Sequence, residues 1–174
     1  MLEIRAYDPR WPAAFEAERE RLARGLGEQA RRIDHHGSTA IPGMAAKPII
    51  DIQISVDTLQ PLPSYAAPLA ALGYRHRPSA DDAVCPFFHR PHEWPHTHHV
   101  HVVAAGGLEE RRTLAFRDYL REHPDVAREY AALKKRLAQG TDASDADARE
   151  AYARAKTAFV EAVLHDALAA GYPR

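Results

Sequence analysis

The sequence predicts an α/β (α+β) protein in which a mixed β-sheet with flanking helices precedes a helical C-terminal half. The strand candidates, which are rich in β-branched residues, all precede residue 105, and from Gly107 onward apolar residues recur at helical intervals. At 174 residues the chain has the usual length of one domain. We therefore expect a single domain over 1–174, with an α/β part over about 1–105 and a helical part over about 106–174.

The N-terminal segment predicts one helix and one short strand. Asp8 and Pro12 suit the start of a helix, and apolar residues then recur at roughly helical intervals. We expect a helix over about 12–30, followed by a strand over 32–36.

A second strand is predicted over 49–56, where β-branched residues dominate. A small, turn-rich stretch over 37–43 lies before it. Because the strand period is two, Asp51, Gln53 and Ser55 share one face. A buried carboxylate is costly unless it is paired or used, so Asp51 is the first candidate for chemistry.

The middle of the chain predicts a short helix over about 64–72 and weaker strands over 74–77 and 86–89, with a loop between the two strands. The C-terminal half predicts helices that Pro124 interrupts and Gly140 stops. After an acidic loop, one final helix is expected to end near Gly171.

Histidine is unusually concentrated in this chain. Nine of its 11 histidines lie between residues 35 and 101, and six of those lie within 89–101. The segment 98–104 alternates in character as a strand does, which places His99 and His101 together on one face.

The net charge of the chain is too small to create a positive electrostatic field that would attract polyanions. The formal net charge is −1, so we expect neither bulk nucleic-acid binding nor membrane binding, and any phosphate must be held locally. No window approaches the ~18 apolar residues of a membrane span, and no apolar leader follows Met1. We expect a cytoplasmic protein whose partner is a nucleotide or another phosphorylated small molecule.

The turn that contains Gly37, Ser38 and Thr39 is the candidate phosphate-binding element. A glycine directly after a strand lets backbone N–H groups approach a phosphate closely, and the serine hydroxyl adds a donor. Such a turn alone is often only a turn. Asp51 on the next strand adds to the signal, because phosphoryl and nucleotidyl transfer use strand-borne carboxylates to hold a hard cation.

Asp51, His99 and His101 are the candidate metal ligands and catalytic residues. One carboxylate holds Mg²⁺ weakly, and two imidazoles on one strand face opposite an aspartate can complete a three-ligand site. The expected cofactor is a divalent metal, Mg²⁺ or Mn²⁺, with Zn²⁺ as a further option. The alternative is that the histidines bond to backbone or to phosphate.

Other basic residues are candidate phosphate ligands with structural alternatives. His35 could donate to a phosphate or pack, and Lys47 could reach a phosphate or remain solvated. Arg117 could form a phosphate fork with Arg121, or both could pair with nearby acids. Two further lysines on predicted helices, Lys134 and Lys156, could point into the cleft.

Several motifs together resemble the GrpB family. The pattern begins with Tyr7-Asp8-Pro9-x-Trp11 and continues with the segment from Gly37 to Ile52. It extends through the motifs His99-Val100-His101-Val102, Phe116-Arg117-Asp118-Tyr119-Leu120-Arg121, Tyr130/Leu133-Lys134 and Tyr152/Lys156.

This resemblance covers about residues 5–165 and implies a nucleotidyltransferase-like fold in a family whose members mostly have no assigned activity. It implies that Gly37 and Ser38 take the place of the Gly-Ser signature of that superfamily, and that Asp51 takes the first of its two acids. Two positions depart from the pattern. His36 replaces an apolar residue, and Gln53 leaves the second acid position uncharged.

Two hypotheses of function remain open from the sequence. The first is an enzyme that transfers a nucleotidyl or phosphoryl group, or hydrolyses a phosphate ester. The second is a non-catalytic nucleotide-binding or partner-stabilising module, which Gln53 favours. A zinc-binding regulatory protein built on the histidines is a weaker third.

Overall fold

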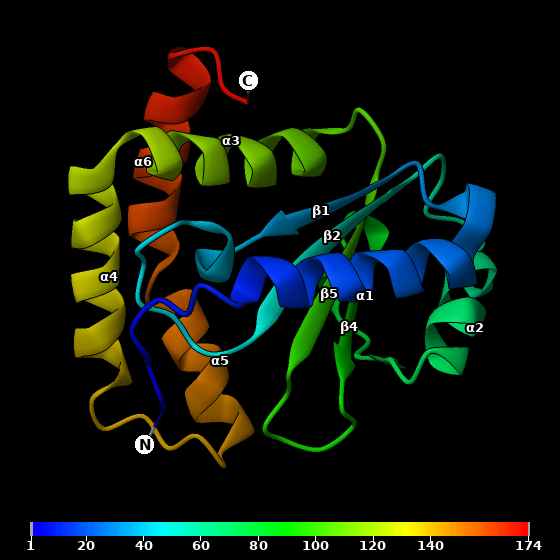
Figure 1. Cartoon of the computed structure of the whole chain (residues 1–174), viewed down its shortest axis with the longest axis horizontal. Coiled ribbons are helices and arrows are strands. Elements are labelled where there is room, and N and C mark those ends of the chain that lie inside the picture. The colour runs from blue at the N-terminus through cyan, green and yellow to red at the C-terminus, as the bar shows by residue number, and fades with distance from the viewer. Residues whose placement is uncertain (1, 174) are drawn as a thin grey trace.

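A mixed β-sheet forms the centre of the molecule, and the computed structural model describes it within residues 2–173 (Figure 1). In that range the sheet has five strands in the order β1-β2-β5-β4-β3. Strands β2 and β5 are parallel, and the other neighbouring pairs are antiparallel. The strand bounds are β1 Arg32–His36, β2 Ile50–Val56, β3 Arg75–His76, β4 Phe87–Arg90 and β5 His98–Ala104.

Helices flank the sheet and continue beyond it. The described residues contain α1 Trp11–Leu26, α2 Pro63–Ala71, α3 Leu108–Glu122, α4 Pro124–Ala138, α5 Ala146–Arg154 and α6 Thr157–Ala169. In Figure 1, α1 and α2 lie beside the sheet, while α3, α4, α5 and α6 form the helical C-terminal half. The predicted α+β class, with a mixed sheet, flanking helices and a helical C-terminal half, is confirmed.

The alternation of side chains along the central strands gives the sheet two different faces. Ile52 and Ile54 of β2 and Val100 and Val102 of β5 are fully buried against α1 and α2 in the main hydrophobic core. The alternate residues, which include Asp51, point to the other face. That second face is therefore the polar one.

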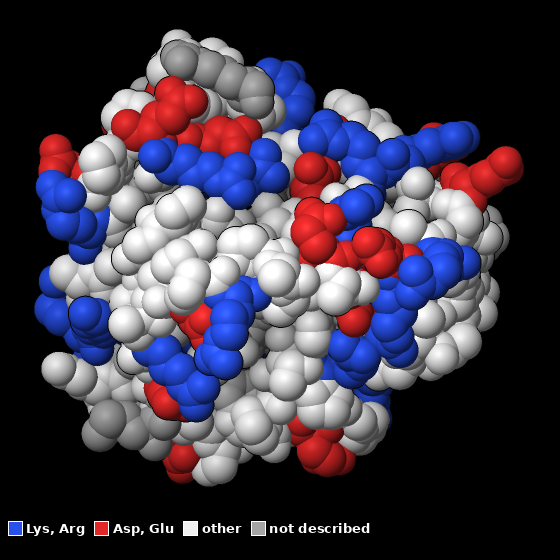
Figure 2. Space-filling view, viewed as in Figure 1, with Lys and Arg blue, Asp and Glu red and all other residues white. Residues whose placement is uncertain are grey.

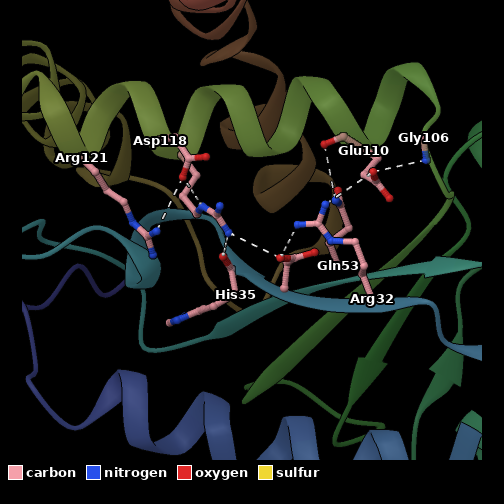
Figure 3. Close-up of polar contacts among 9 residues, drawn as sticks. Arg32, His35, Gln53, Gly106, Glu110, Asp118 and Arg121 are labelled. Carbon is pink, nitrogen blue, oxygen red and sulfur yellow. Dashed lines mark hydrogen bonds and ion pairs between the residues drawn. The ribbon is translucent and has the colours of Figure 1, made fainter. Parts of the chain in front are cut away.

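Helix α3 covers part of the polar face through hydrogen bonds and ion pairs rather than through apolar contacts alone (Figure 3). The Gln53 amide donates to the Glu110 carbonyl at 3.5 Å, and Arg117 donates to the His35 carbonyl at 3.1 Å. Arg121 donates to the Ala40 carbonyl at 3.0 Å. These contacts join α3 to β2, to β1 and to the turn after β1.

The helical half has its own apolar clusters, which continue from α3. Ile41 and Met44, from the segment between β1 and β2, pack with Leu120, Tyr130 and Val163 of α3, α4 and α6. The turn-rich segment is thus packed between the sheet and the C-terminal helices, which brings residues far apart in the sequence together.

Some predicted boundaries are wrong. The first helix ends at Leu26 rather than near residue 30, because Gly27 has a φ of 55° and a 3₁₀ turn follows it. The predicted single final helix is two helices, α5 and α6, which separate at the turn of Ala155 and Lys156. Neither glycine nor proline marks this break, so the helical periodicity of the sequence gave no sign of it.

The described part of the chain contains no helix with both the length and the hydrophobicity needed to cross a bilayer. Figure 2 shows Lys and Arg side chains interspersed with Asp and Glu over the visible face. This mixture agrees with the net charge of −1.

Candidate functional site

A cleft of about 370 Å³ lies where the turn after β1, strands β2 and β5 and helices α4 and α5 meet. Several of the residues singled out from the sequence line it: Gly37, Ser38, Thr39, Lys47, Asp51, His99 and His101. Lys134 and Lys156 line it as well. The structure therefore brings most of the predicted site residues to one place.

Asp51 and His99 form a contact at the base of the cleft. They are direct partners in the parallel register of β2 and β5, and the His99 Nδ1 atom lies 3.3 Å from the Asp51 Oδ1 atom. Burial, the largest single influence, raises the pKa of Asp51, but the hydrogen bond and charge interaction with His99, together with smaller contributions from His36 and His101, outweigh it and hold the pKa below its usual range. Asp51 is therefore ionised at neutral pH, beside an imidazole that it orients.

His36 and His101 stand next to this pair and are neutral. Their rings meet edge to face at 5.1 Å between centroids. Desolvation lowers the pKa of His36 to about 3 and that of His101 to about 4. The His101 Nδ1 atom also lies 3.7 Å from the Cys85 sulfur. An uncharged imidazole can serve as a ligand or as a hydrogen-bonding partner, but not as a fixed positive charge.

The predicted three-ligand metal site is only partly assembled. Within residues 2–173, no group of three or more His, Cys, Asp or Glu side chains is spaced to hold a metal ion. Asp51 and His99 are close enough to act together, whereas His101 contacts Cys85 and His36 instead. The Asp51 carboxylate suits an ion that takes its other ligands from a bound phosphate and water, as Mg²⁺ commonly does.

Lys134 is the most deeply buried cation of the cleft, with an exposed fraction of 3%. Its Nζ atom donates to the Ser38 hydroxyl at 2.7 Å and to the Ala45 carbonyl at 2.6 Å, and it lies 4.9 Å from the centre of the Tyr130 ring. Desolvation, and then the charge of Lys156, lower the pKa of Lys134 to about 7. The three groups in direct contact with this amine, the Ser38 hydroxyl, the Ala45 carbonyl and the Tyr130 ring, are all neutral.

Lys47 and Lys156 share one aromatic ring. Their Nζ atoms lie 5.1 and 4.5 Å from the centre of the Tyr152 ring. Desolvation lowers the pKa of Lys156 to about 8 and also lowers that of Lys47. A cation over a tyrosine face is stabilised by about 0.5–2 kcal/mol, far less than a buried charge loses on leaving water. These lysines therefore favour an anion in the cleft.

Gly37 is required at the turn for two reasons. Its φ is 66°, which L side chains rarely adopt, and a Cβ built there would lie 2.9 Å from both Cβ and Cγ of Asp51. The glycine therefore allows the turn to lie directly against the carboxylate.

We expect Gly37→Ala to lower the free energy of unfolding by about 2–4 kcal/mol, because backbone strain and a clash add together. Gly43→Ala is the matched control. Gly43 has a φ of 78°, but a Cβ added there would meet no atom within 4 Å, so only strain of about 1 kcal/mol applies. Denaturant titration measures both, and equal losses would show that the contact with Asp51 is not important.

His35 and Arg117 are placed outside the cleft, contrary to the prediction that they bind phosphate. His35 is buried, stacks on Phe15 with 4.7 Å between ring centroids, and shares a 2.9 Å hydrogen bond with Thr39. Arg117 donates to the carboxylate of its neighbour Asp118 at 2.7 Å and also lies 3.9 Å from that of Asp34 (Figure 3). Arg117 packs on the polar face of the sheet under α3, whereas the His35 ring packs on the opposite face against α1.

We expect Arg117→Met to lower the free energy of unfolding by about 2–4 kcal/mol, because Asp118 would lose its closest partner in a mostly buried position. Binding of phosphate compounds in the cleft should change less than threefold. Thermal denaturation and calorimetric titration of the same variant measure the two effects. A large loss of phosphate binding with an unchanged fold would show that Arg117 is a phosphate ligand after all.

Gln53, the uncharged residue at the second acid position, also lies away from the cleft. It is fully buried, and its amide contacts the Glu110 carbonyl of α3. A carboxylate at this position would face the underside of α3 with that carbonyl beside it, which is an unfavourable place for a charge.

Aromatic residues complete the cleft, some of which the sequence had pointed to only as part of the histidine-rich run or of the family motifs, without a stated role. Tyr130, Tyr152, Trp94 and His96 line it. The four-residue spacing of Tyr130 with Lys134, and of Tyr152 with Lys156, is a helical (i, i+4) pattern that could have indicated paired rings and amines.

The fold and this basic, aromatic-lined cleft define an α+β protein with a candidate anion site between its sheet and its helical half. The family model described as GrpB protein matches residues 1–166, so the chain belongs to the GrpB family, and the resemblance noted in the sequence is confirmed.

Individual relatives agree with this assignment. The chain is 42% identical over 137 residues to the UPF0157 protein YqkA of Bacillus subtilis, covering 79% of this chain and 40% of that protein. It is 40% identical over 172 residues to a UPF0157 protein of Pseudomonas aeruginosa, covering 97% of this chain and 69% of that one. The crystal structure of GrpB from Enterococcus faecalis matches with a TM-score of 0.82 and 33% identity, covering 95% of this chain and 97% of that one.

Proposed function

We propose that the cleft binds a nucleotide or another phosphorylated small molecule and supports transfer of its nucleotidyl or phosphoryl group, or its hydrolysis. The observation that carries the proposal is the convergence of Lys47, Lys134 and Lys156 on one cleft, each held by neutral groups. One carboxylate of the cleft, Asp51, acts on all three amines from beyond ion-pair distance, so the cleft keeps an excess of positive charge that a phosphate chain would balance.

The Gly37 turn gives the phosphates a second set of donors. Ser38 begins a 3₁₀ turn, Ser38–Ala40, at the edge of the cleft, and its hydroxyl already contacts the Lys134 amine. Backbone N–H groups at the start of such a turn lack partners within it, so they are available to an oxyanion.

Asp51 and His99 supply the chemistry in this proposal. His99 Nδ1 is held by Asp51, so His99 Nε2 accepts the proton of a water or hydroxyl oxygen that forms the new bond to phosphorus. In the free cleft this Nε2 atom lies 3.1 Å from His96 Nδ1, a contact that the reacting oxygen replaces. The bond from phosphorus to the leaving phosphate oxygen breaks, and the lysines neutralise the charge that develops on that oxygen. A divalent ion, if held by the Asp51 carboxylate together with the phosphates, would supply further charge neutralisation.

The alternative function is a binding module without turnover. The placement of Gln53 under α3 favours it, because that position does not offer a second carboxylate to the cleft. Calorimetric titration with ATP, with and without Mg²⁺, and an assay for phosphate release separate the two. Binding that is indifferent to metal and without turnover supports the module.

The matched variant for this test is Asp51→Asn. We expect metal-free ATP to bind Asp51→Asn as tightly as, or up to about tenfold more tightly than, the wild type, because a like charge is removed from the phosphates. Any enhancement by Mg²⁺ and any turnover should be lost. If the variant kept the metal effect and full turnover, Asp51 would have no part in the chemistry.

A further inference from the structure

A second cavity of about 210 Å³ lies beside the cleft. It shares Lys47, Ile49, Trp94 and His96 with the cleft, so the two spaces adjoin along these side chains. A ligand held by its phosphates at Lys47 can therefore extend into the second cavity without leaving the protein surface.

The walls of this cavity differ in chemistry from those of the cleft. Beyond the shared residues, they come from Leu2, Glu3, Pro48, Pro95 and Ala143. Trp94 and the two prolines offer flat, apolar surfaces. The Glu3 carboxylate and the His96 ring add hydrogen-bonding groups among the lining residues.

Trp94 is fixed in position before any ligand binds. The Arg149 guanidinium lies 4.6 Å from the centre of its ring, and Arg149 donates to the Ala143 carbonyl at 2.7 Å. The His96 ring meets Trp94 with 5.2 Å between centroids. Arg149 lines the cleft but not the second cavity, so Trp94 lies between this arginine and the largely apolar wall of the second cavity.

We propose that the second cavity holds the base of a nucleotide whose phosphates lie among the cleft lysines. This inference rests on the proposed function and narrows its ligand to a nucleoside phosphate. A cavity lined by an indole and two prolines offers flat side chains to a planar ring, and ligand sites of this kind place a few polar groups among apolar walls. The Glu3 carboxylate, which also accepts from Arg5, and the His96 ring, whose Nδ1 atom contacts His99, place polar groups beside the polar edge of a base.

The test compares ATP with methyl triphosphate, which carries the same phosphate chain without a nucleoside. Trp11 and Trp94 are the two tryptophans of the chain, so Trp11→Phe leaves Trp94 as the single indole reporter. We expect ATP to quench Trp94 fluorescence. ATP should also bind about tenfold or more tightly than methyl triphosphate, because stacking of the base on an aromatic side chain adds that much affinity. Methyl triphosphate should bind without quenching.

A second variant blocks the cavity while leaving the lysines in place. Ala143→Phe should remove the advantage of ATP and leave the affinity for methyl triphosphate unchanged within about threefold. Ala158→Phe, on the exposed surface of α6, is the control and should change neither. Circular dichroism of each variant checks that the fold is intact.

The outcomes separate this inference from the proposed function. Equal affinities for ATP and methyl triphosphate would overturn the inference and leave the phosphate site standing. Tighter binding of geranyl diphosphate than of ADP would also overturn it, because the cavity would then hold an alkyl chain. If none of these compounds bound, both proposals would fail together.

Discussion

Lys134→Met is expected to weaken phosphate binding strongly and at the same time to stabilise the fold. The amine is 3% exposed, and desolvation holds its pKa at about 7, well below its ordinary value. Methionine has a similar length and removes the cost of burying a charge, so we expect the free energy of unfolding to rise by about 1–3 kcal/mol. Loss of a buried cation that pairs with a phosphate should weaken ATP binding by about a hundredfold or more.

The pH dependence of stability tests whether the higher free energy of unfolding of Lys134→Met comes from removal of a buried charge. Between about pH 7 and pH 10.5, Lys134 is mostly neutral in the folded protein but still protonated in the unfolded chain. Because the unfolded chain then binds more protons than the folded protein, the free energy of unfolding of the wild type should rise with pH over this range. Urea titrations across this range measure that rise, which Lys134→Met should lack.

Lys135→Met is the control for these experiments. Lys135 is exposed on the other side of the same helical turn, and its replacement should change the free energy of unfolding by less than about 0.5 kcal/mol and leave binding intact. If Lys134→Met lost stability instead, the hydrogen bonds of Lys134 to Ser38 and Ala45 would outweigh its desolvation.

Binding of ATP is expected to take up protons from solution. In the free protein the pKa values of Lys134 and Lys156 are about 7 and about 8, so at pH 8 much of each amine is neutral. Phosphate oxygens raise both pKa values, because a nearby negative charge favours the protonated form. Affinity should therefore be highest below about pH 7 and fall above pH 8, by up to about tenfold per pH unit for each lysine.

Calorimetry in buffers of different ionisation enthalpy measures this proton uptake. Measurements above about pH 8 avoid the titration of the ATP phosphates themselves, whose last proton has a pKa near 6. The Lys156→Met variant should take up fewer protons than the wild type. Proton release, or no exchange in any buffer, would contradict the assignment of these lysines as the phosphate ligands.

The part of the site that lies on strands could be predicted from the sequence. A period of two placed Asp51 on the polar face of one strand and His99 on one face of another, and the parallel register brings these two residues directly opposite each other. The residues of the Gly37 turn were also predicted from local sequence, because a glycine and a serine directly after a strand are followed by Asp51 on the next strand.

The part of the site that lies on helices could be predicted only weakly. Lys134 is 96 residues from Ser38 along the chain, and the packing of α4 against the turn, which the sequence does not reveal, brings them together. Arg117 shows the reverse case. Its position on a predicted helix was compatible with phosphate binding or with an ion pair to a nearby acid. In the structure the carboxylates of Asp34 and Asp118 lie close enough to hold its side chain between α3 and the sheet.

Tyr152 contributes both to the packing of helix α5 and to the cleft, so ligand binding in the cleft should affect the stability of that helix. Of the residues of α5, all of which the structure describes, Tyr152 is the buried one, so this helix has little apolar anchorage of its own. The same ring supports Lys47 and Lys156. Hydrogen exchange should therefore be faster in the amides of α5 than in those of β2, and a phosphate that binds the two lysines would slow exchange in α5 first.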